Sequence, residues 1–276
     1  MQFREILIKF NRIKCMIIFW IIIVFHRIKN YLRYTKLHYL YLRIKNPNWI
    51  SWINNEVNFY KVFLKTDKLI FDLGANIGDK THIFSFFSKK IVSYEPEEKL
   101  CEKLKLRFRN FKSIIIKNKV LSDKIGEINF YSVQDDESYS SILKNYTIDH
   151  PQLKNRKVIK KIKNSTNLNE EIKLHGVPYY IKIDCEGAEE TILKDLDYFV
   201  DIISFEANLP KFYNPTIRII DHLTTKFNYI INFREEGKFI FEFKENFERK
   251  HIQKLLKEYN NTCEIFLFKN KKKKGQ

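Results

Sequence analysis

Short apolar runs alternate with amphipathic segments from residue 68 onward, and this alternation is typical of a parallel α/β sheet. The runs with the length and composition of buried strands lie at 69–73, 91–95, 114–120, 179–184 and 202–207. Segments with helical spacing lie between them, at 80–88, 97–109, 188–196 and 216–227. The pattern therefore predicts an open sheet whose strands are joined by helices.

The pattern changes in the middle and at the end of this region. Two apolar segments, 229–233 and 239–243, flank a turn at 235–237 and predict an antiparallel pair. Residues 264–268 are predicted to be the last strand. Residues 122–168 are more polar and less regular. We expect them to form an insertion at the carboxyl edge of the sheet, where such segments recognise substrates.

The first 54 residues have a different pattern and are predicted to be a helical extension. Residues 15–25 are all apolar, but they are too few to cross a bilayer, which takes about 20 residues. Residues 28–43 have amphipathic spacing with Lys and Arg on one face, which is typical of a helix lying on an anionic membrane. Two alternatives stay open: packing on the rest of the protein or on a second subunit, and a true span. A signal peptide is disfavoured because no small-residue cleavage site follows.

Composition indicates a folded protein in a reducing compartment. The chain of 276 residues is 44% hydrophobic and 15% aromatic, which a disordered chain is not. Its four cysteines lie far apart, so neither a disulfide framework nor a zinc site is predicted. We divide the chain into the extension at 1–54, a globular domain at 55–268 and a lysine-rich tail at 269–276.

The net charge of +17 suggests nucleic acid as a partner, but its distribution does not. Residues 1–60 contain ten Lys or Arg and two acids, and the tail adds five lysines. Most of the excess therefore lies outside the globular domain. We expect no nucleic acid partner, and we expect residues 1–45 to contact an anionic membrane surface.

A glycine turn follows the first predicted strand. The sequence from Asp72 to Gly78 places Gly74, Asn76 and Gly78 between a strand and a helix, where the backbone can approach a nucleotide ligand. The second strand ends at Glu95, which is placed to accept hydrogen bonds from ribose hydroxyls. Together these residues predict a site for an adenosine-like group, although a tight turn with a helix-capping acid would look similar.

The turn favours S-adenosylmethionine over a dinucleotide. The GxGxxG pattern of dinucleotide-binding enzymes is missing. The carboxylate of Asp72 beside the turn would repel a diphosphate, whereas it would attract the positive sulfonium of S-adenosylmethionine.

Acidic residues gather at the ends of two later strands. Asp184, Glu186, Glu189 and Glu190 follow the fourth strand within seven residues, and Glu206 ends the fifth. The dipole of the next helix explains Glu189 and Glu190. It does not explain Asp184 and Glu186, and such clusters are more often functional than structural. All five residues lie at the sheet edge where ligands bind.

These motifs resemble the FkbM-type family of S-adenosylmethionine-dependent methyltransferases. The segments that match the family are 72–78, 95–96 and 182–189, together with Ser122, Asp123, Gly126 and Glu206. The resemblance covers residues 55–268. It implies a class I methyltransferase (Rossmann-like) fold, with a mostly parallel sheet of seven strands and a late antiparallel strand.

The resemblance also implies O-methylation of a hydroxyl of a sugar, glycan or glycolipid. The residues predicted to bind S-adenosylmethionine are Asp72, Gly74, Asn76, Gly78, Glu95 and Ser122. Our catalytic hypothesis makes Asp184 the base or its orienter, with Glu186 and Glu206 positioning sugar hydroxyls. In an alternative, Asp184, Glu206 and Asn208 hold a divalent cation. No metal is expected.

Two other functions remain as alternatives. A nucleic-acid methyltransferase would fit the basic ends, but the chain lacks the Asn/Asp-Pro-Pro-aromatic motif and a Pro-Cys nucleophile. A non-catalytic binding module at the membrane periphery would fit the extension. The expected location of the protein is the cytoplasm. The extension adds the option of a peripheral position at the inner face of the membrane.

Overall fold

The computed structural model describes residues 44–65, 67–149, 153, 156–244 and 247–270. Backbone contacts divide the chain into two compact units, residues 1–52 and 53–276, and only the second is treated below. The apolar run at 15–25 and the amphipathic segment at 28–43 lie outside the described residues, so their membrane role stays a prediction. Within the described part of the chain, no helix is both long and apolar enough to cross a bilayer.

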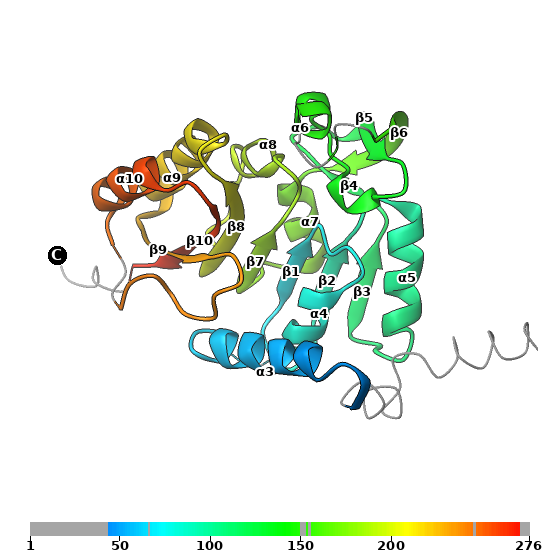
Figure 1. Ribbon diagram of the computed structural model, residues 1–276, viewed down its shortest axis with the longest axis horizontal. Helices are drawn as coiled ribbons and strands as arrows, with labels where there is room; N and C mark the ends of the chain where they lie inside the picture. The colour runs from blue at the N-terminus through cyan, green and yellow to red at the C-terminus, as the bar shows by residue number, and fades with distance from the viewer. Residues whose placement is uncertain (1–43, 66, 150–152, 154–155, 245–246, 271–276) are drawn as a thin grey trace, which may run out of the picture. The chain divides into compact units, whose positions relative to one another are not determined.

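A sheet of seven strands forms the centre of the domain, in the order β3-β2-β1-β7-β8-β10-β9 (Figure 1). The pairs from β3 to β8 are parallel, whereas β10 runs antiparallel to both β8 and β9. The bounds are β1 Ile70–Leu73, β2 Ile91–Tyr94, β3 Ile114–Lys117, β7 Tyr180–Ile183, β8 Ile202–Asn208, β9 Tyr229–Glu235 and β10 Thr262–Lys269. The predicted fold class is confirmed.

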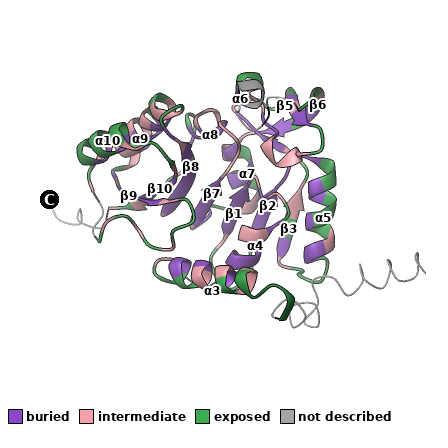
Figure 2. Ribbon diagram, in the orientation of Figure 1, coloured by how far each residue is buried: buried purple, intermediate pink, exposed green. Residues whose placement is uncertain are grey.

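Alternate residues of each strand point to opposite faces of the sheet. Helices pack against the apolar side chains on these faces. Phe71, Ile181 and Phe205 belong to a core with apolar residues of the later helices. The inner strands β1, β2 and β7 are fully buried in Figure 2, whereas the edge strand β3 is partly exposed and α5 alternates between buried and exposed positions. The helices are α3 Pro47–Lys61, α4 Asp79–Phe84, α5 Glu98–Phe108, α6 Lys144–Asp149, α7 Leu168–His175, α8 Glu189–Leu193, α9 Tyr213–Phe227 and α10 Arg249–Glu258.

The opposite face of the sheet carries several charged side chains. Asp72 and Lys182 are buried at paired strand positions there, and Glu264, which is partly buried, accepts a hydrogen bond from the Tyr60 hydroxyl of α3 at 3.5 Å. Arg234 of β9 lies next to Glu264 in the strand ladder. This face therefore combines an aromatic core with a buried ionic network.

Two strand predictions are wrong. Residues 114–120 are not one strand: β3 ends at Lys117, and β4 (Val120–Leu121) belongs to a separate small sheet. Residues 239–243 form no strand: β10 pairs with one side of β9, and on the other side the Glu242 N–H donates to the backbone oxygen of Phe233 at 2.9 Å without a regular ladder. Ile240 is accordingly 70% exposed.

The insertion at 122–168 has more regular structure than its sequence predicts. Strands β5 (Gly126–Val133) and β6 (Val158–Thr166) pair antiparallel, and β6 also pairs with β4. A 3-10 turn, η1 (Glu137–Tyr139), and α6 connect the two long strands. Residues of this insertion and of the carboxyl ends of β1, β2 and β7 line one cavity.

Candidate active site

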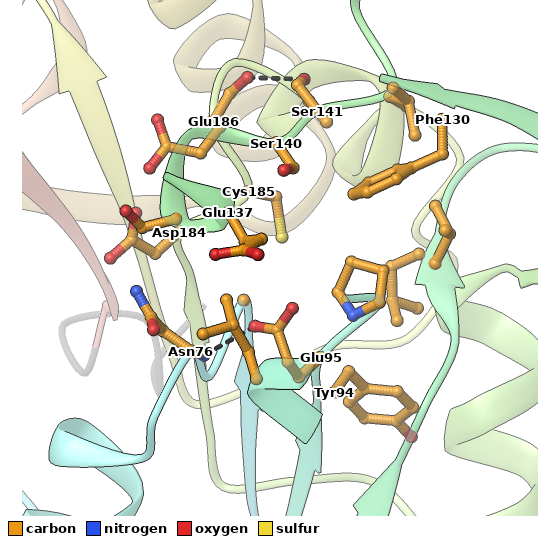
Figure 3. A pocket seen from close by; sticks show the side chains of 18 of the residues that line it. Asn76, Tyr94, Glu95, Phe130, Glu137, Ser140, Ser141, Asp184, Cys185 and Glu186 are labelled. Atoms are coloured by element: carbon orange, nitrogen blue, oxygen red, sulfur yellow. Dashed lines mark hydrogen bonds between the residues drawn. The ribbon is translucent and has the colours of Figure 1, made fainter. Parts of the chain in front are cut away.

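The main cavity of the domain lies at the carboxyl ends of three parallel strands. Gly74 and Asn76 follow β1, Glu95 follows β2, and Asp184 follows β7. Figure 3 shows the side chains of Asn76, Glu95 and Asp184 around one opening, with Phe130, Ser140 and Ser141 of the insertion across from them. Ligands of open α/β sheets bind at this edge.

Gly74 is required because two chain segments meet there. Its φ is +77°, and a Cβ at this position would lie 1.7 Å from the backbone oxygen of Asp184. Any other residue would push the β1 turn away from the end of β7. Gly74 therefore keeps the predicted cofactor turn next to the acidic segment.

Gly78 has a packing role. Its φ is +87°, and a Cβ there would lie 2.4 Å from Leu104 Cδ1 and 2.6 Å from Phe108 Cε2. The glycine thus lets the start of α4 pack closely against α5. Gly78 does not line the cavity.

Glu95 presents a fixed carboxylate to the cavity (Figure 3). Its two oxygens accept hydrogen bonds from the backbone N–H groups of Asn76 and Glu97, both at 2.8 Å. Burial raises the pKa of Glu95 to about 7, although these two N–H groups act in the opposite direction. The side chain is therefore held in one orientation and titrates near neutral pH.

Asp72 and Ser122 lie outside the cavity lining. Asp72 is fully buried, accepts a hydrogen bond from the Thr81 hydroxyl at 2.5 Å, and has a pKa raised by burial. The Ser122 hydroxyl is buried and donates to the carboxylate of Asp123 at 2.9 Å. The structure thus brings Gly74, Asn76 and Glu95 to the cavity and places Asp72 and Ser122 behind it.

Asp184 is paired with a buried lysine. The Lys182 ammonium donates to Asp184 Oδ2 at 2.7 Å, and the Lys182 side chain is 6% exposed against 35% for Asp184. Although burial acts to lower the pKa of Lys182, the charges of Asp184 and Asp72 raise it. This ion pair holds the Asp184 carboxylate at the cavity wall.

Glu186 and Glu206 have strongly raised pKa values. Burial and the negative charge of Asp184 raise the pKa of Glu186 to about 8, and the same two causes raise that of Glu206. The Tyr146 hydroxyl donates to Glu186, and the Asn208 side chain donates to Glu206 at 3.2 Å. Glu186 lines the main cavity, whereas Glu206 lines a smaller adjoining cleft.

The insertion supplies cavity residues that the sequence did not identify. They include Phe130, Glu137, Ser140 and Ser141. The Ser141 hydroxyl donates to the backbone oxygen of Glu186 at 2.8 Å, and Lys99 pairs with Glu137 at 2.6 Å. The only signal was a Tyr-, Ser- and Asp-rich composition, which does not show where a loop folds.

The described residues offer no evident metal centre. No three His, Cys, Asp or Glu side chains are grouped among them as metal ligands would be. Asp184 is paired with Lys182, and Glu206 with Asn208. The divalent-cation alternative gains no support from this geometry.

The sheet order and a site at the ends of β1, β2 and β7 define a class I methyltransferase. The sequence model of the Methyltransferase FkbM domain matches residues 72–260. The chain therefore belongs to the FkbM methyltransferase family, as the sequence motifs indicated.

Comparisons with individual proteins add little detail. No curated protein matches the sequence. Precorrin-6y C5,15-methyltransferase from Geobacter metallireducens is 12% identical with a TM-score of 0.43, over 78% of this chain and 87% of that chain. Aeropyrum pernix fibrillarin with bound S-adenosyl-L-methionine is 10% identical with a TM-score of 0.39, over 74% and 67%. At these identities the similarities say nothing about the acceptor.

Proposed function

We propose that the protein transfers the methyl group of S-adenosylmethionine to a hydroxyl of a sugar, glycan or glycolipid. The observation that carries this proposal is the fixed carboxylate of Glu95 in a cavity that Asp184 and Glu186 also line. A carboxylate at the end of the second strand suits two ribose hydroxyls. A surplus of carboxylates suits a cationic sulfonium.

The residues of the cavity fit S-adenosylmethionine in their chemistry. Glu95 would hold the ribose, apolar residues such as Leu100 and Phe130 would contact the base, and Asp184 would face the sulfonium end. When bound, the cofactor supplies an electrophilic methyl group. The cavity measures about 90 Å³, below the roughly 300–1000 Å³ of typical small-molecule sites. Binding therefore requires the walls of the cavity to move apart.

Asp184 is the best-placed base for an acceptor hydroxyl. It is ion-paired with Lys182, and its side chain lines the cavity. It would take the hydroxyl proton on a carboxylate oxygen, a step typically worth about 10²–10⁴-fold in rate. Glu186 and Glu206, with their raised pKa values, would hold neighbouring hydroxyls by hydrogen bonds.

Calorimetry with S-adenosylhomocysteine tests the cofactor. We expect the wild type to bind it and Glu95→Gln to bind roughly 10- to 100-fold more weakly, because a charge-assisted hydrogen bond contributes about 1.5–3 kcal/mol. Glu236→Gln, which alters an exposed acid outside the cavity, is the matched control. Absence of binding to the wild type would favour the non-catalytic binding module.

Mass spectrometry of surface glycans and glycolipids, from cells with and without the gene, tests the reaction. We expect one species to lose a methyl increment when the gene is removed. With that acceptor in hand, Asp184→Asn should bind S-adenosylhomocysteine normally but lose at least about 100-fold in turnover. Full turnover of Asp184→Asn would show that Asp184 is not the base.

The membrane contact is a separate proposal that the sequence alone supports. Residues 1–45 combine an apolar run with many Lys and Arg, which fits a peripheral position on an anionic, inner leaflet. The full chain should sediment with vesicles containing phosphatidylserine and not with purely zwitterionic vesicles. Equal binding to both vesicles, or to neither, would rule this contact out.

A further inference from the structure

A second hollow, here called the aromatic groove, adjoins the main cavity. It measures about 370 Å³, which lies in the range of small-molecule sites. Ile142 lines both the groove and the cavity. The rest of its lining includes three aromatic rings and two lysines: Tyr131, Tyr146, Phe212, Lys144 and Lys211.

Tyr146 and Phe212 form an aromatic wall that is connected to the acids of the active site. Their ring centroids are 5.4 Å apart. Gly187 makes room for them, because a Cβ there would lie 2.7 Å from Tyr146 and 3.1 Å from Phe212. The Tyr146 hydroxyl donates to the carboxylate of Glu186. The C–H groups of a sugar are attracted to the negative faces of aromatic rings, so a sugar on this wall would lie beside Glu186.

The aromatic groove is basic, in contrast to the acidic cavity. Lys144 and Lys211 are exposed, and the lysine ion pairs of the described residues all involve other lysines. The Lys211 ammonium lies 6.0 Å from the Tyr146 ring centroid and 5.7 Å from that of Phe212. No acid is among the described residues that line the groove. Two positive charges therefore adjoin the rings, and the described lining of the groove contributes no carboxylate beside them.

We propose that the aromatic groove is the acceptor subsite and that the acceptor is a sugar bearing an anionic group, a phosphate or a carboxylate. Phe212 contacts the sugar ring, with the buried ring of Tyr146 packed behind it, and Lys144 and Lys211 pair with the anionic group. The inference rests on the proposed methyl transfer to a sugar hydroxyl and narrows its acceptor.

Binding of three probes to the full chain, measured by ligand-observed NMR titration, tests this acceptor class. The probes are glucose 1-phosphate, methyl glucuronide and the neutral methyl glucoside. At least one anionic probe should bind tenfold or more tightly than the neutral one, and the preferred probe distinguishes phosphate from carboxylate. Equal binding of all three, or binding of none, would overturn the proposal.

Variants locate the binding. Lys144→Gln and Lys211→Gln should each weaken the anionic probe at least threefold without changing the neutral one. The control Lys254→Gln makes the same charge change at an exposed position of α10, away from the groove, and should have no effect. Phe212→Leu should weaken charged and neutral probes alike. If neither lysine variant changes the affinity, the anionic acceptor is wrong.

S-adenosylhomocysteine binding, measured on the same samples, separates the two proposals. It should be unchanged in Lys144→Gln and Lys211→Gln, because neither lysine lines the main cavity. Sugar binding through the lysines without S-adenosylhomocysteine binding would leave the subsite standing and refute the methyl transfer. S-adenosylhomocysteine binding with no preference for anionic sugars would refute the anionic-sugar subsite and leave the methyl transfer standing.

Discussion

Glu264 is the carboxylate whose loss should cost the fold most. It accepts a hydrogen bond from Arg234 Nε at 2.8 Å and one from the Ser204 hydroxyl at 2.7 Å, and it forms an ion pair with Arg234 Nη2 at 2.6 Å. Arg234 also contacts Glu56, which pairs with Lys80 at 2.6 Å. Two carboxylates therefore balance two cations, and Glu264→Gln would leave a buried positive charge in excess. Breaking a buried pair in this way costs about 3–5 kcal/mol.

The pKa of Glu264 gives an independent estimate of the same quantity. Burial acts to raise this pKa, but the charges of Arg234, Lys80 and Lys182 outweigh it and lower the pKa from 4.5 to about 2. At about 1.36 kcal/mol per pKa unit, this difference corresponds to about 3 kcal/mol. Because the folded-state pKa is the lower one, the stabilisation is complete above pH 4.5 and is lost as the pH falls toward 2.

Urea unfolding followed by far-UV circular dichroism measures the effect. At pH 7 the free energy of unfolding of Glu264→Gln should be about 3–5 kcal/mol below that of the wild type. The gap should narrow by about 2 kcal/mol between pH 6 and pH 3. The exposed control Glu236→Gln should differ from the wild type by less than about 0.5 kcal/mol. A gap below about 1 kcal/mol at pH 7, or one independent of pH, would refute the reasoning.

Two further predictions concern the active site. Gly74→Ala should separate the β1 turn from the end of β7, since its Cβ would lie 1.7 Å from the Asp184 oxygen. We expect lower thermal stability and at least tenfold weaker S-adenosylhomocysteine binding. Wild-type values for both would show that the turn can relax and would contradict this prediction. The affinity for S-adenosylhomocysteine should fall severalfold as the pH drops from 8 to 6, because the pKa of Glu95 is about 7 and only the ionised carboxylate is a charged acceptor. Calorimetry between pH 6 and pH 8 measures this affinity. The affinity of Glu95→Gln should change less with pH, and a wild-type affinity that is independent of pH would contradict the prediction.

The sequence alone determined the framework of the fold. The parallel strands β1, β2, β7 and β8 are buried apolar runs of four to seven residues, and such runs are visible in the pattern itself. The acids that follow β2 and β7 could be placed at one edge because parallel strands end on the same side of a sheet. The charge distribution also separated the basic extension from the acidic site.

Only the tertiary structure decided which motif residues reach the cavity. Gly74 and Gly78 look equivalent in the sequence, yet the first makes room for the backbone of β7 and the second for side chains of α5. Asp72 and Ser122 are close along the chain to residues that line the cavity, but they are themselves buried behind it. These differences depend on contacts between residues distant along the chain, which no local pattern records.

Long-range pairing also decided the end of the sheet and the insertion. Residues 229–233 and 239–243 make a plausible local hairpin, but β9 forms its ladder with the distant β10, and the nearby segment contributes a backbone hydrogen bond from Glu242 to Phe233 on the other side without becoming a strand. The polar insertion folds into strands because β6 pairs with both β4 and β5, and this pairing carries Phe130 and Ser141 to the cavity. The elements that contain a buried apolar run were therefore predictable from the sequence. The elements that depend on pairing with partners far away in the chain were decided by the three-dimensional packing.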